Sequence, residues 1–210
     1  MIIVLFEDDD IMVVNKPAGL PSQKTANEDI TPLPDYLGEN LTPVHRLDQR
    51  VSGLILLSKN KESFVAMQED FINRNVKKYY RAIVGSAPSP RENTLTHWLI
   101  RDGKQKKAKL YNEEIHRSKK AILKYKLIQS TEKYHMLEIE LFTGRFHQIR
   151  AQLSAIGCSI VGDMKYGFKR STPDGSIFLQ SFHLEFAHPK TKKQLLFEIE
   201  QPELWKKYGF

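Results

Sequence analysis

Short apolar runs along the chain predict a protein built mainly on β-strands. Residues 2–6 and 11–14 are rich in Ile and Val and flank an acidic turn, so they are expected to pair with each other. The all-apolar run at 54–57 follows a Ser-Gly turn signal and is typical of a strand buried on both faces. Residues 135–142 alternate between apolar and polar positions, which predicts a strand with one buried face. Further strand-like runs lie at 79–84, 178–186 and 195–199.

Two other segments have the apolar spacing of helices. Asn60 is placed to cap a helix whose apolar positions recur at helical spacing through Ile72. Thr143 is expected to cap a second helix, whose apolar stripe ends at Ile156 and which Gly157 terminates.

Both turns and helices link these elements, without the regular βαβ rhythm of a doubly wound fold. The pattern favours an α+β protein with a mixed, mainly antiparallel sheet and flanking helices and loops. Neither a repeat nor a flexible linker divides the chain, although the loop at 19–43 is long. We therefore expect one domain over residues 1–210.

The composition is that of an ordinary globular protein, with 40% hydrophobic and 27% charged residues. No apolar run approaches the roughly 20 residues that span a bilayer, and the first apolar run lacks the basic start of a secretory signal. A single cysteine, Cys158, excludes an internal disulfide framework and fits a reducing compartment. We expect a cytoplasmic protein without a membrane partner.

The net charge of +7 is concentrated in one segment of the chain. Residues 101–126 contain ten Lys and Arg against three acids, a surplus that equals the whole net charge. A local surplus of this kind is either the footprint of a polyanion or a solvated hairpin tip, and charge alone does not separate the two interpretations.

The first candidate site lies where the long loop meets the buried strand. His45, Arg46 and Asp48 place an imidazole, a guanidinium and a carboxylate within four residues. A strand end is a rigid mount for a reactive carboxylate. The structural alternative is a turn carboxylate that bonds nearby backbone amides.

The second candidate is the segment 143–150, Thr-Gly-Arg-Phe-His-Gln-Ile-Arg. It places Arg145 and Arg150 beside the donors His147 and Gln148 at the start of a predicted helix, where the helix dipole favours an anion. The alternative is an ordinary capped helix with a polar face. Cations at both candidate sites would keep the carboxylate of the first one ionised.

Aromatic and basic residues alternate in the Lys78-Tyr79-Tyr80-Arg81 segment. Such a segment can stack on bases and hold phosphates, or it can be a strand whose tyrosine bodies pack in the core. The histidines lack a convincing metal-ligand spacing, and His183 and His188 are expected to be structural. Because the common nucleotide-binding fingerprints are also missing, neither a metal nor a cofactor is expected.

These motifs, in their order and spacing, resemble those of the RluA-type RNA pseudouridine synthases. The similarity covers nearly the whole chain and implies a pseudouridine-synthase-like catalytic domain with a central cleft. We expect the chain to start directly in that domain, without the S4 domain of many relatives. The matching segments are 9–21 with its Lys-Pro-Ala-Gly loop, 44–57 (VHRLDQRVSGLILL), 78–82 (KYYRA), 143–150 (TGRFHQIR), 160–167 and 186–189 (FAHP).

The resemblance implies that Asp48 is the catalytic aspartate of uridine isomerisation in structured RNA, ribosomal, transfer or both. The aspartate would either attack C1′ of the ribose or abstract the C2′ proton, and no cofactor or metal would be needed. Tyr80 matches the tyrosine that packs on the target base and is a candidate for removing the C5 proton. Arg145 matches the arginine that pairs with the aspartate, and Arg46 the one that fills the space of the flipped-out nucleotide.

The remaining RNA contacts are expected in two groups. One group surrounds the flipped uridine, and the other lies outside the pocket in the basic segment. The first comprises His45, Arg46, Lys78, His147, Gln148 and Arg150, and the second comprises Lys104, Lys106, Lys107 and Lys109. We expect the protein to act as a monomer.

The chain departs from the family pattern at three places, which affect substrate detail more than the reaction. They are residues 49–51, Phe146 in place of a small hydroxyl residue, and Gln152 where His is common. One alternative function is a catalytically silent RNA-binding or ribosome-assembly factor on the same fold. Another is an aspartate-dependent hydrolase, which would need a second carboxylate that the motif lacks.

Overall fold

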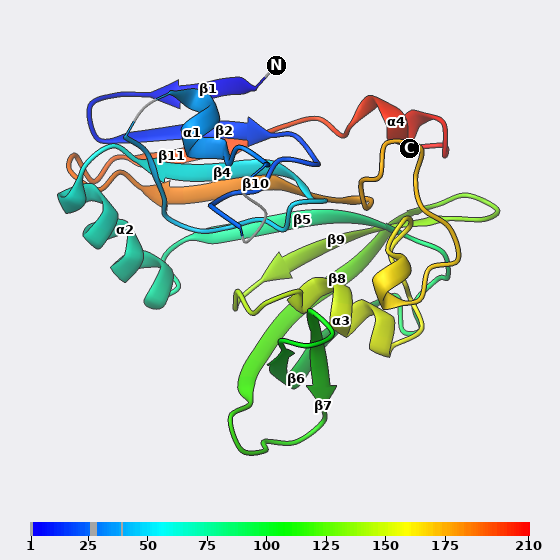
Figure 1. The fold of residues 1–210 in the computed structure, drawn as a ribbon. Coiled ribbons are helices and arrows are strands. Elements are labelled where there is room, and N and C mark those ends of the chain that lie inside the picture. The colour runs from blue at the N-terminus through cyan, green and yellow to red at the C-terminus, as the bar shows by residue number, and fades with distance from the viewer. Residues whose placement is uncertain (1, 26–28, 39) are drawn as a thin grey trace. The chain divides into compact units, whose positions relative to one another are not determined.

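The computed structural model describes residues 2–25, 29–38 and 40–210 (Figure 1). The chain forms two compact units, and each is described by itself. Unit 1 consists of Met1–Lys78 and Gln180–Glu200, and unit 2 consists of Tyr79–Leu179 and Gln201–Phe210. Each unit therefore draws on separate stretches of the sequence. This division into two compact units does not test the expected single domain over 1–210, which stays a prediction.

The sheet of unit 1 has the strand order β1–β2–β4–β10–β11, with β3 also paired to β4. Its pairs are antiparallel except β4–β10, which is parallel. The strands are β1 (Ile3–Glu7), β2 (Ile11–Lys16), β3 (Thr42–Pro43), β4 (Ser52–Ser58), β10 (Leu179–Ala187) and β11 (Gln194–Glu198).

Gly53 permits the close approach of β4 and β10. It pairs with Ser181, its φ is +121°, and a Cβ atom there would overlap the Ser181 backbone. Only glycine satisfies both conditions without strain.

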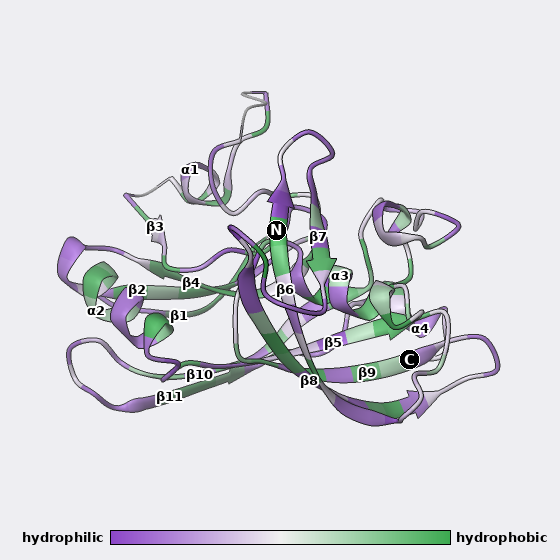
Figure 2. Cartoon of the chain, turned by 90° about the horizontal axis from the view of Figure 1, so that it is seen from below, coloured by the Kyte–Doolittle hydropathy of each residue, from purple (hydrophilic) through white to green (hydrophobic). Residues whose placement is uncertain are grey.

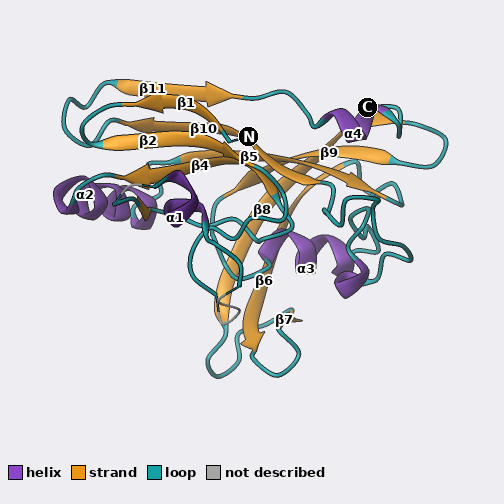
Figure 3. Ribbon diagram, turned by 45° about the horizontal axis from the view of Figure 1, so that its top comes forward, coloured by secondary structure: helices purple, strands orange, loops and turns teal. Residues whose placement is uncertain are grey.

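The central strands of unit 1 are buried on both faces. Alternate residues of β2 and β4 enter one apolar cluster with Met67 of α2 (Lys61–Ile72), and the others enter a second cluster with Leu33 of α1 (Leu33–Leu37). Both helices are visible beside the strands in Figure 3. The expected cap of α2 is confirmed, because Asn60 accepts a 2.8 Å hydrogen bond from the Ser63 amide. The expectation that Ile72 belongs to the apolar stripe is wrong, since it is 75% exposed at the last turn.

Unit 2 holds a fully antiparallel sheet in the order β5–β9–β8–β6–β7. The basic segment 101–126 forms the end of β6, all of β7 and the start of β8, as expected for strands and turns. The elements are β5 (Lys77–Val84), β6 (Glu92–Asp102), β7 (Lys107–Tyr111), β8 (Lys119–Ser130), β9 (His135–Leu141), α3 (Gln148–Ala155), the 3₁₀ turn η1 (Met164–Tyr166) and α4 (Glu203–Lys206).

Helix α3 packs against β6 and β7, and its Ala151 belongs to one apolar cluster with Leu99, Ala108, Ala121 and Tyr166. The small alanines of this cluster let the helix lie close to the strands. The predicted α+β class with a mixed, mainly antiparallel sheet is confirmed. Within the described ranges, none of the helices has both the length and the apolar character that crossing a membrane requires.

Candidate active site

Asp48 lies in the turn that leads into β4, in unit 1. Its carbonyl oxygen accepts a 3.0 Å hydrogen bond from the Val51 amide. The preceding residue, Leu47, is held on both sides by Ser22, whose hydroxyl donates to the Leu47 carbonyl at 2.9 Å and accepts from its amide at 3.1 Å. The rigid mount that the sequence predicts for this carboxylate is therefore present, and the long loop helps to build it.

Lys16 is a second charged residue of this region, and its side chain is completely buried. Its Nζ donates to the carbonyl oxygens of Pro17 and Leu20 at 2.8 Å each and to that of Gln49 at 3.5 Å. Burial lowers the pKa of Lys16 to about 7, and the negative charge of Asp48 acts in the opposite direction. The ammonium group thus ties the loop after β2 to the residue that follows Asp48.

Lys16 begins the Lys-Pro-Ala-Gly loop of the segment 9–21, and its sequence position alone predicts no role for it. A signal was present, because a lysine ends a strand that begins with four apolar residues and is followed directly by Pro17. A lysine in such a place is rarely buried without a specific set of acceptors.

His45 serves the fold of unit 1. Its Nε2 accepts a 3.0 Å hydrogen bond from the Leu56 amide, and its ring stacks on Phe71 at 5.0 Å. Burial, with a smaller effect of the Lys78 charge, lowers the pKa of His45 to about 3, so the ring is neutral near pH 7. This argues against a cationic contact of His45 with RNA.

Two further predicted RNA ligands lie in unit 1. The Lys78 Nζ lies 5.0 Å from the centre of the Phe71 ring, and burial lowers the pKa of Lys78 to about 8. Arg46 is exposed. RNA contact by either residue stays a prediction.

Tyr80 lies on β5 in unit 2, opposite Ile139 of β9, and is buried. Its neighbour Tyr79 lies opposite Glu140 and is half-buried, since successive side chains of a strand point to opposite faces. One tyrosine of the pair is therefore a core residue of the sheet. The role of Tyr80 toward a base stays a prediction.

The loop that carries Arg145 is fixed by Gln148. The Gln148 Oε1 accepts from the Thr143 hydroxyl at 2.8 Å and from the Arg145 amide at 3.0 Å, and its Nε2 donates to the Ile122 carbonyl at 3.1 Å. Arg145 is exposed, and its Nε donates to the Lys120 carbonyl at 3.1 Å. Because the Gln148 amide is buried and engaged in three bonds, the geometry argues against RNA contact by Gln148.

The expected helix cap at Thr143 is wrong. Helix α3 begins at Gln148, after His147 in a left-handed conformation with φ of 52°, and the His147 side chain makes no capping hydrogen bond to the described residues. The Thr143 hydroxyl instead accepts from the Ile122 amide of β8 at 2.8 Å. Thr143 thus bonds the neighbouring strand β8 and not the start of the helix. The anion site that was expected at a helix start capped by Thr143 is therefore not formed.

Arg150 forms a buried ion pair with Asp163. Its Nε lies 2.7 Å from Oδ2 and its Nη2 lies 2.8 Å from Oδ1, and the side chains are 5% and 0% exposed. This two-point pair gives Arg150 a structural role and argues against the RNA contact expected for it.

The four lysines of the second predicted RNA-binding group lie on and beside the β6–β7 turn, which is hydrophilic in Figure 2. Lys104 and Lys106 are exposed, and Lys107 is half-buried. Lys109 forms a 3.0 Å ion pair with Asp102, which raises the pKa of Lys109. Lys109 therefore contributes less free charge than its neighbours.

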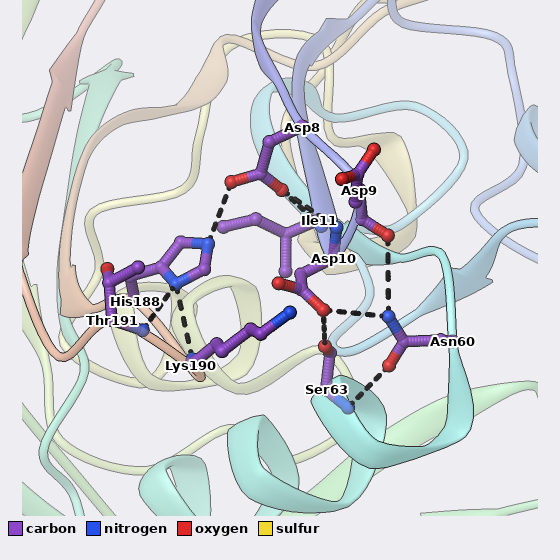
Figure 4. Close-up of polar contacts among 9 residues, drawn as sticks. All are labelled: Asp8, Asp9, Asp10, Ile11, Asn60, Ser63, His188, Lys190 and Thr191. Atoms are coloured by element: carbon purple, nitrogen blue, oxygen red, sulfur yellow. Dashed lines mark hydrogen bonds and ion pairs between the residues drawn. The ribbon is translucent and has the colours of Figure 1, made fainter.

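Among the residues that the structure describes, Asp8, Asp10 and His188 bring metal-ligating atoms within 4.8 Å of one another (Figure 4). The Nδ1 of His188 accepts from the amides of Lys190 and Thr191, so Nε2 carries the proton and donates to Asp8 at 2.8 Å. Both ring nitrogens are thereby engaged, and a metal ion on Nε2 would have to displace that proton. The group fits a structural brace, as the sequence predicts for His188, better than a metal site.

The structure divides the predicted catalytic residues between the units. Asp48 belongs to unit 1, whereas Tyr80 and Arg145 belong to unit 2. Within its own unit, each residue lies on a segment that is held by buried hydrogen bonds or strand pairing. The central cleft that the resemblance implies stays a prediction.

Comparisons with known proteins identify one family. The family model described as RNA pseudouridylate synthase matches residues 10–155, which include all three predicted catalytic residues. An uncharacterised RNA pseudouridine synthase of Mycoplasma pneumoniae is 36% identical over 204 residues, which cover 94% of this chain and 66% of that protein. Ribosomal large subunit pseudouridine synthase D of Zymomonas mobilis is 31% identical over 223 residues, covering 95% of this chain and 69% of that protein.

The chain spans about two thirds of the length of these curated relatives, 65% in the case of the Mycoplasma genitalium protein. Two solved human structures share the fold. RNA Pseudouridylate Synthase Domain Containing 4 has a TM-score of 0.75 at 24% identity, with 97% of this chain and 90% of that chain covered. Domain Containing 1 has a TM-score of 0.78 at 21% identity, with 98% and 86% covered.

Proposed function

The chain belongs to the RNA pseudouridylate synthase family, and we propose that it isomerises uridine to pseudouridine in structured RNA. The observation that carries the proposal is Asp48 in its family motif, on a turn that Ser22 and Lys16 hold through backbone carbonyls on either side of it. A reactive carboxylate needs this kind of fixed mount.

The reaction balances without a co-reactant. The bond from C1′ to N1 of uracil breaks, a bond from C1′ to C5 forms, C5 loses a proton and N1 gains one. Asp48 supplies the carboxylate, either as a nucleophile at C1′ or as a base at C2′. Tyr80 and Arg145 keep the roles that the resemblance implies for them.

RNA is the proposed partner for two reasons. The chain belongs to this family, and it has a local surplus of positive charge in residues 101–126. The name of the Zymomonas relative supports ribosomal RNA as the first substrate to test, with transfer RNA second. The buried free thiol of Cys158 is consistent with the proposed cytoplasmic location, and a monomer is the proposed working state.

The decisive experiment compares wild-type protein with Asp48→Asn, which keeps the shape of the side chain and removes its charge. Pseudouridines are mapped in cellular RNA from a strain that lacks the gene and is complemented with either form. We expect one or more sites to disappear in the deletion strain and to return only with the wild type. A wild-type protein that binds RNA but restores no site would instead support the silent RNA-binding alternative.

A second experiment tests the basic segment. Changing Lys104, Lys106, Lys107 and Lys109 together to Gln should weaken RNA binding and reduce its salt dependence. The matched control changes four exposed lysines elsewhere, Lys133, Lys192, Lys193 and Lys207. If RNA binding by the two quadruple variants has the same salt dependence, the basic segment is a solvated surface that does not contact RNA.

A further inference from the structure

A stack of planar side chains lies beside Arg145 in unit 2. The ring of Phe146 lies 3.8 Å from that of His147, with 19° between their planes. The guanidinium carbon of Arg101 lies 4.8 Å from the centre of the Phe146 ring. Since His147 covers one face of Phe146 at stacking distance, Arg101 lies over the other face.

The inner end of this stack is fixed to the sheet. The Tyr166 hydroxyl accepts a 2.7 Å hydrogen bond from the Ala108 amide of β7 and lies 3.0 Å from His147 Nδ1. The His147 ring meets the Tyr166 ring edge-on at 80°. At the outer end, Arg101 is exposed where β6 ends.

Positive charge surrounds the stack. The Lys165 Nζ donates to the Lys106 carbonyl at 3.1 Å, and Lys107 lies 5.9 Å from the centre of the Tyr166 ring. Burial and then the charge of Arg150 lower the pKa of Lys165, the charge of Asp163 raises it, and Lys106 and Lys107 lower it further. Asp163 forms an ion pair with Arg150, and Asp102 forms one with Lys109.

We infer that Arg101, placed over the Phe146 ring, is a platform on which an unpaired RNA base stacks, while Lys106, Lys107 and Lys165 hold the adjoining phosphates. The inference rests on the proposed function, since RNA is the substrate it needs. Bases in single-stranded RNA stack on guanidinium planes and aromatic rings, and phosphates require nearby cations. The stack presents a planar surface for a base, and the lysines supply cations for the phosphates.

The structural alternative is that Phe146 and Arg101 merely pack together, because Phe146 also borders the apolar cluster under α3. Two conservative variants separate the interpretations. Arg101→Lys keeps the charge and removes the plane, and Phe146→Leu keeps the apolar contact and removes the ring. Arg91→Lys is the matched control, since Arg91 is exposed just before the other end of β6.

The test measures binding of a short oligouridylate that carries one central 2-aminopurine, whose fluorescence falls when it stacks. For Arg101→Lys and Phe146→Leu we expect weaker quenching and a Kd raised by about tenfold. The salt slope of Arg101→Lys should equal that of the wild type, because no charge is lost. Arg91→Lys should bind like the wild type.

Wild-type affinity and quenching in both variants, or no quenching in the wild type, would overturn the inference. Pseudouridine formation by the wild type and by both variants is measured in parallel. If the wild type forms pseudouridine and both variants bind normally, the stacking platform fails while the proposed function stands. Loss of the proposed function would show instead as no pseudouridine from any form.

Discussion

Gln148 accepts a hydrogen bond from the backbone amide of Arg145 at 3.0 Å, three residues before it in the chain. The side-chain amide of Gln148 also accepts a hydrogen bond from the Thr143 hydroxyl and donates one to the Ile122 carbonyl on β8. The loop that presents Arg145 is thus fixed by a side chain inside it. Positioning of this kind matters in catalysis because small displacements of a functional group cost large factors in rate.

Replacing Gln148 should therefore affect both stability and activity. Gln148→Ala removes one hydrogen bond each from the Thr143 hydroxyl, the Arg145 amide and the Ile122 carbonyl, at a cost of about 2–3 kcal/mol in the free energy of unfolding. Gln148→Glu keeps the acceptor for Thr143 and Arg145 and should retain more of the turnover. Denaturant unfolding and kcat for pseudouridine formation measure the two effects.

Gln105→Ala, at an exposed position of the β6–β7 turn, is the control for the Gln148 variants and should change neither quantity. A Gln148→Ala protein with reduced stability and unchanged kcat would show that the loop braces the fold without positioning Arg145.

Lys16 gives a prediction that depends on pH. Its folded pKa of about 7 lies below the usual 10.5, so between these values the unfolded chain holds a proton that the folded protein has released. Stability from this group therefore rises with pH across that window, by up to about 1.4 kcal/mol per pH unit. Lys16→Met should remove this rise, measured as the difference between the two unfolding curves from pH 7 to 10.

Lys16→Met also removes the hydrogen bonds to Pro17, Leu20 and Gln49, so kcat should fall by about tenfold to a hundredfold as the Asp48 turn loosens. Lys61→Met, at an exposed position of α2, controls for the loss of one charge. Equal pH dependence of stability in the wild type and Lys16→Met would contradict the assigned pKa.

Local patterns predicted the strands and α2 because apolar period and capping are properties of neighbouring residues. Helix α1 was missed, since it is one short turn that follows Pro32 and has no apolar period of its own. The parallel pairing of Gly53 with Ser181 joins residues far apart in the sequence, which no local pattern records. Motif spacing indicated Asp48, but it did not show that Lys16 braces its turn.

The predicted RNA contacts that the geometry argues against share a similar origin. An arginine in a motif looks the same whether it faces RNA or an internal acid, and Arg150 meets Asp163 only after the chain has passed α3 and turned back. Gln148 and His45 likewise found backbone partners on neighbouring strands, Ile122 and Leu56. Whether such a side chain is buried decides its role, and burial depends on the folded chain and not on the neighbouring residues in the sequence.

The Arg150–Asp163 pair leads to a third prediction. Arg150→Met leaves the buried Asp163 carboxylate without its partner and should lower the free energy of unfolding by about 3–5 kcal/mol. The double variant Arg150→Met, Asp163→Leu should lose much less than the sum of the two single changes. Denaturant unfolding of the four proteins measures the coupling, and strictly additive losses would contradict the pair's role.

The Lys206–Glu203 pair is the exposed counterpart of this ion pair, with side chains 64% and 84% exposed. Lys206→Ala should leave the unfolding midpoint unchanged, because exposed pairs contribute little.

The last prediction concerns the brace between Asp8 and His188, which joins the β1–β2 turn to the β10–β11 turn. The Nδ1 of His188 accepts two backbone amides, so its Nε2 must donate. Asp8→Asn turns an amide NH₂ toward that donor, because the other oxygen still accepts from the amides of Asp10 and Ile11. Two donors then face each other, at a cost of about 1–3 kcal/mol near neutral pH.

Acid should weaken the same brace in the wild type, because protonation removes the negative charge that these hydrogen bonds stabilise. Burial raises the pKa of Asp8, but the hydrogen bonds from Ile11, Asp10 and His188 outweigh it and hold the pKa below 3.8. The stability from this carboxylate is therefore complete above the usual pKa and is lost as pH falls through the lower folded value. Asp8→Asn should be less sensitive to acid than the wild type in unfolding curves between neutral pH and pH 3. Asp9→Asn, which changes the same charge at the exposed neighbouring position, should keep the acid sensitivity of the wild type, and equal curves for all three proteins would contradict the brace.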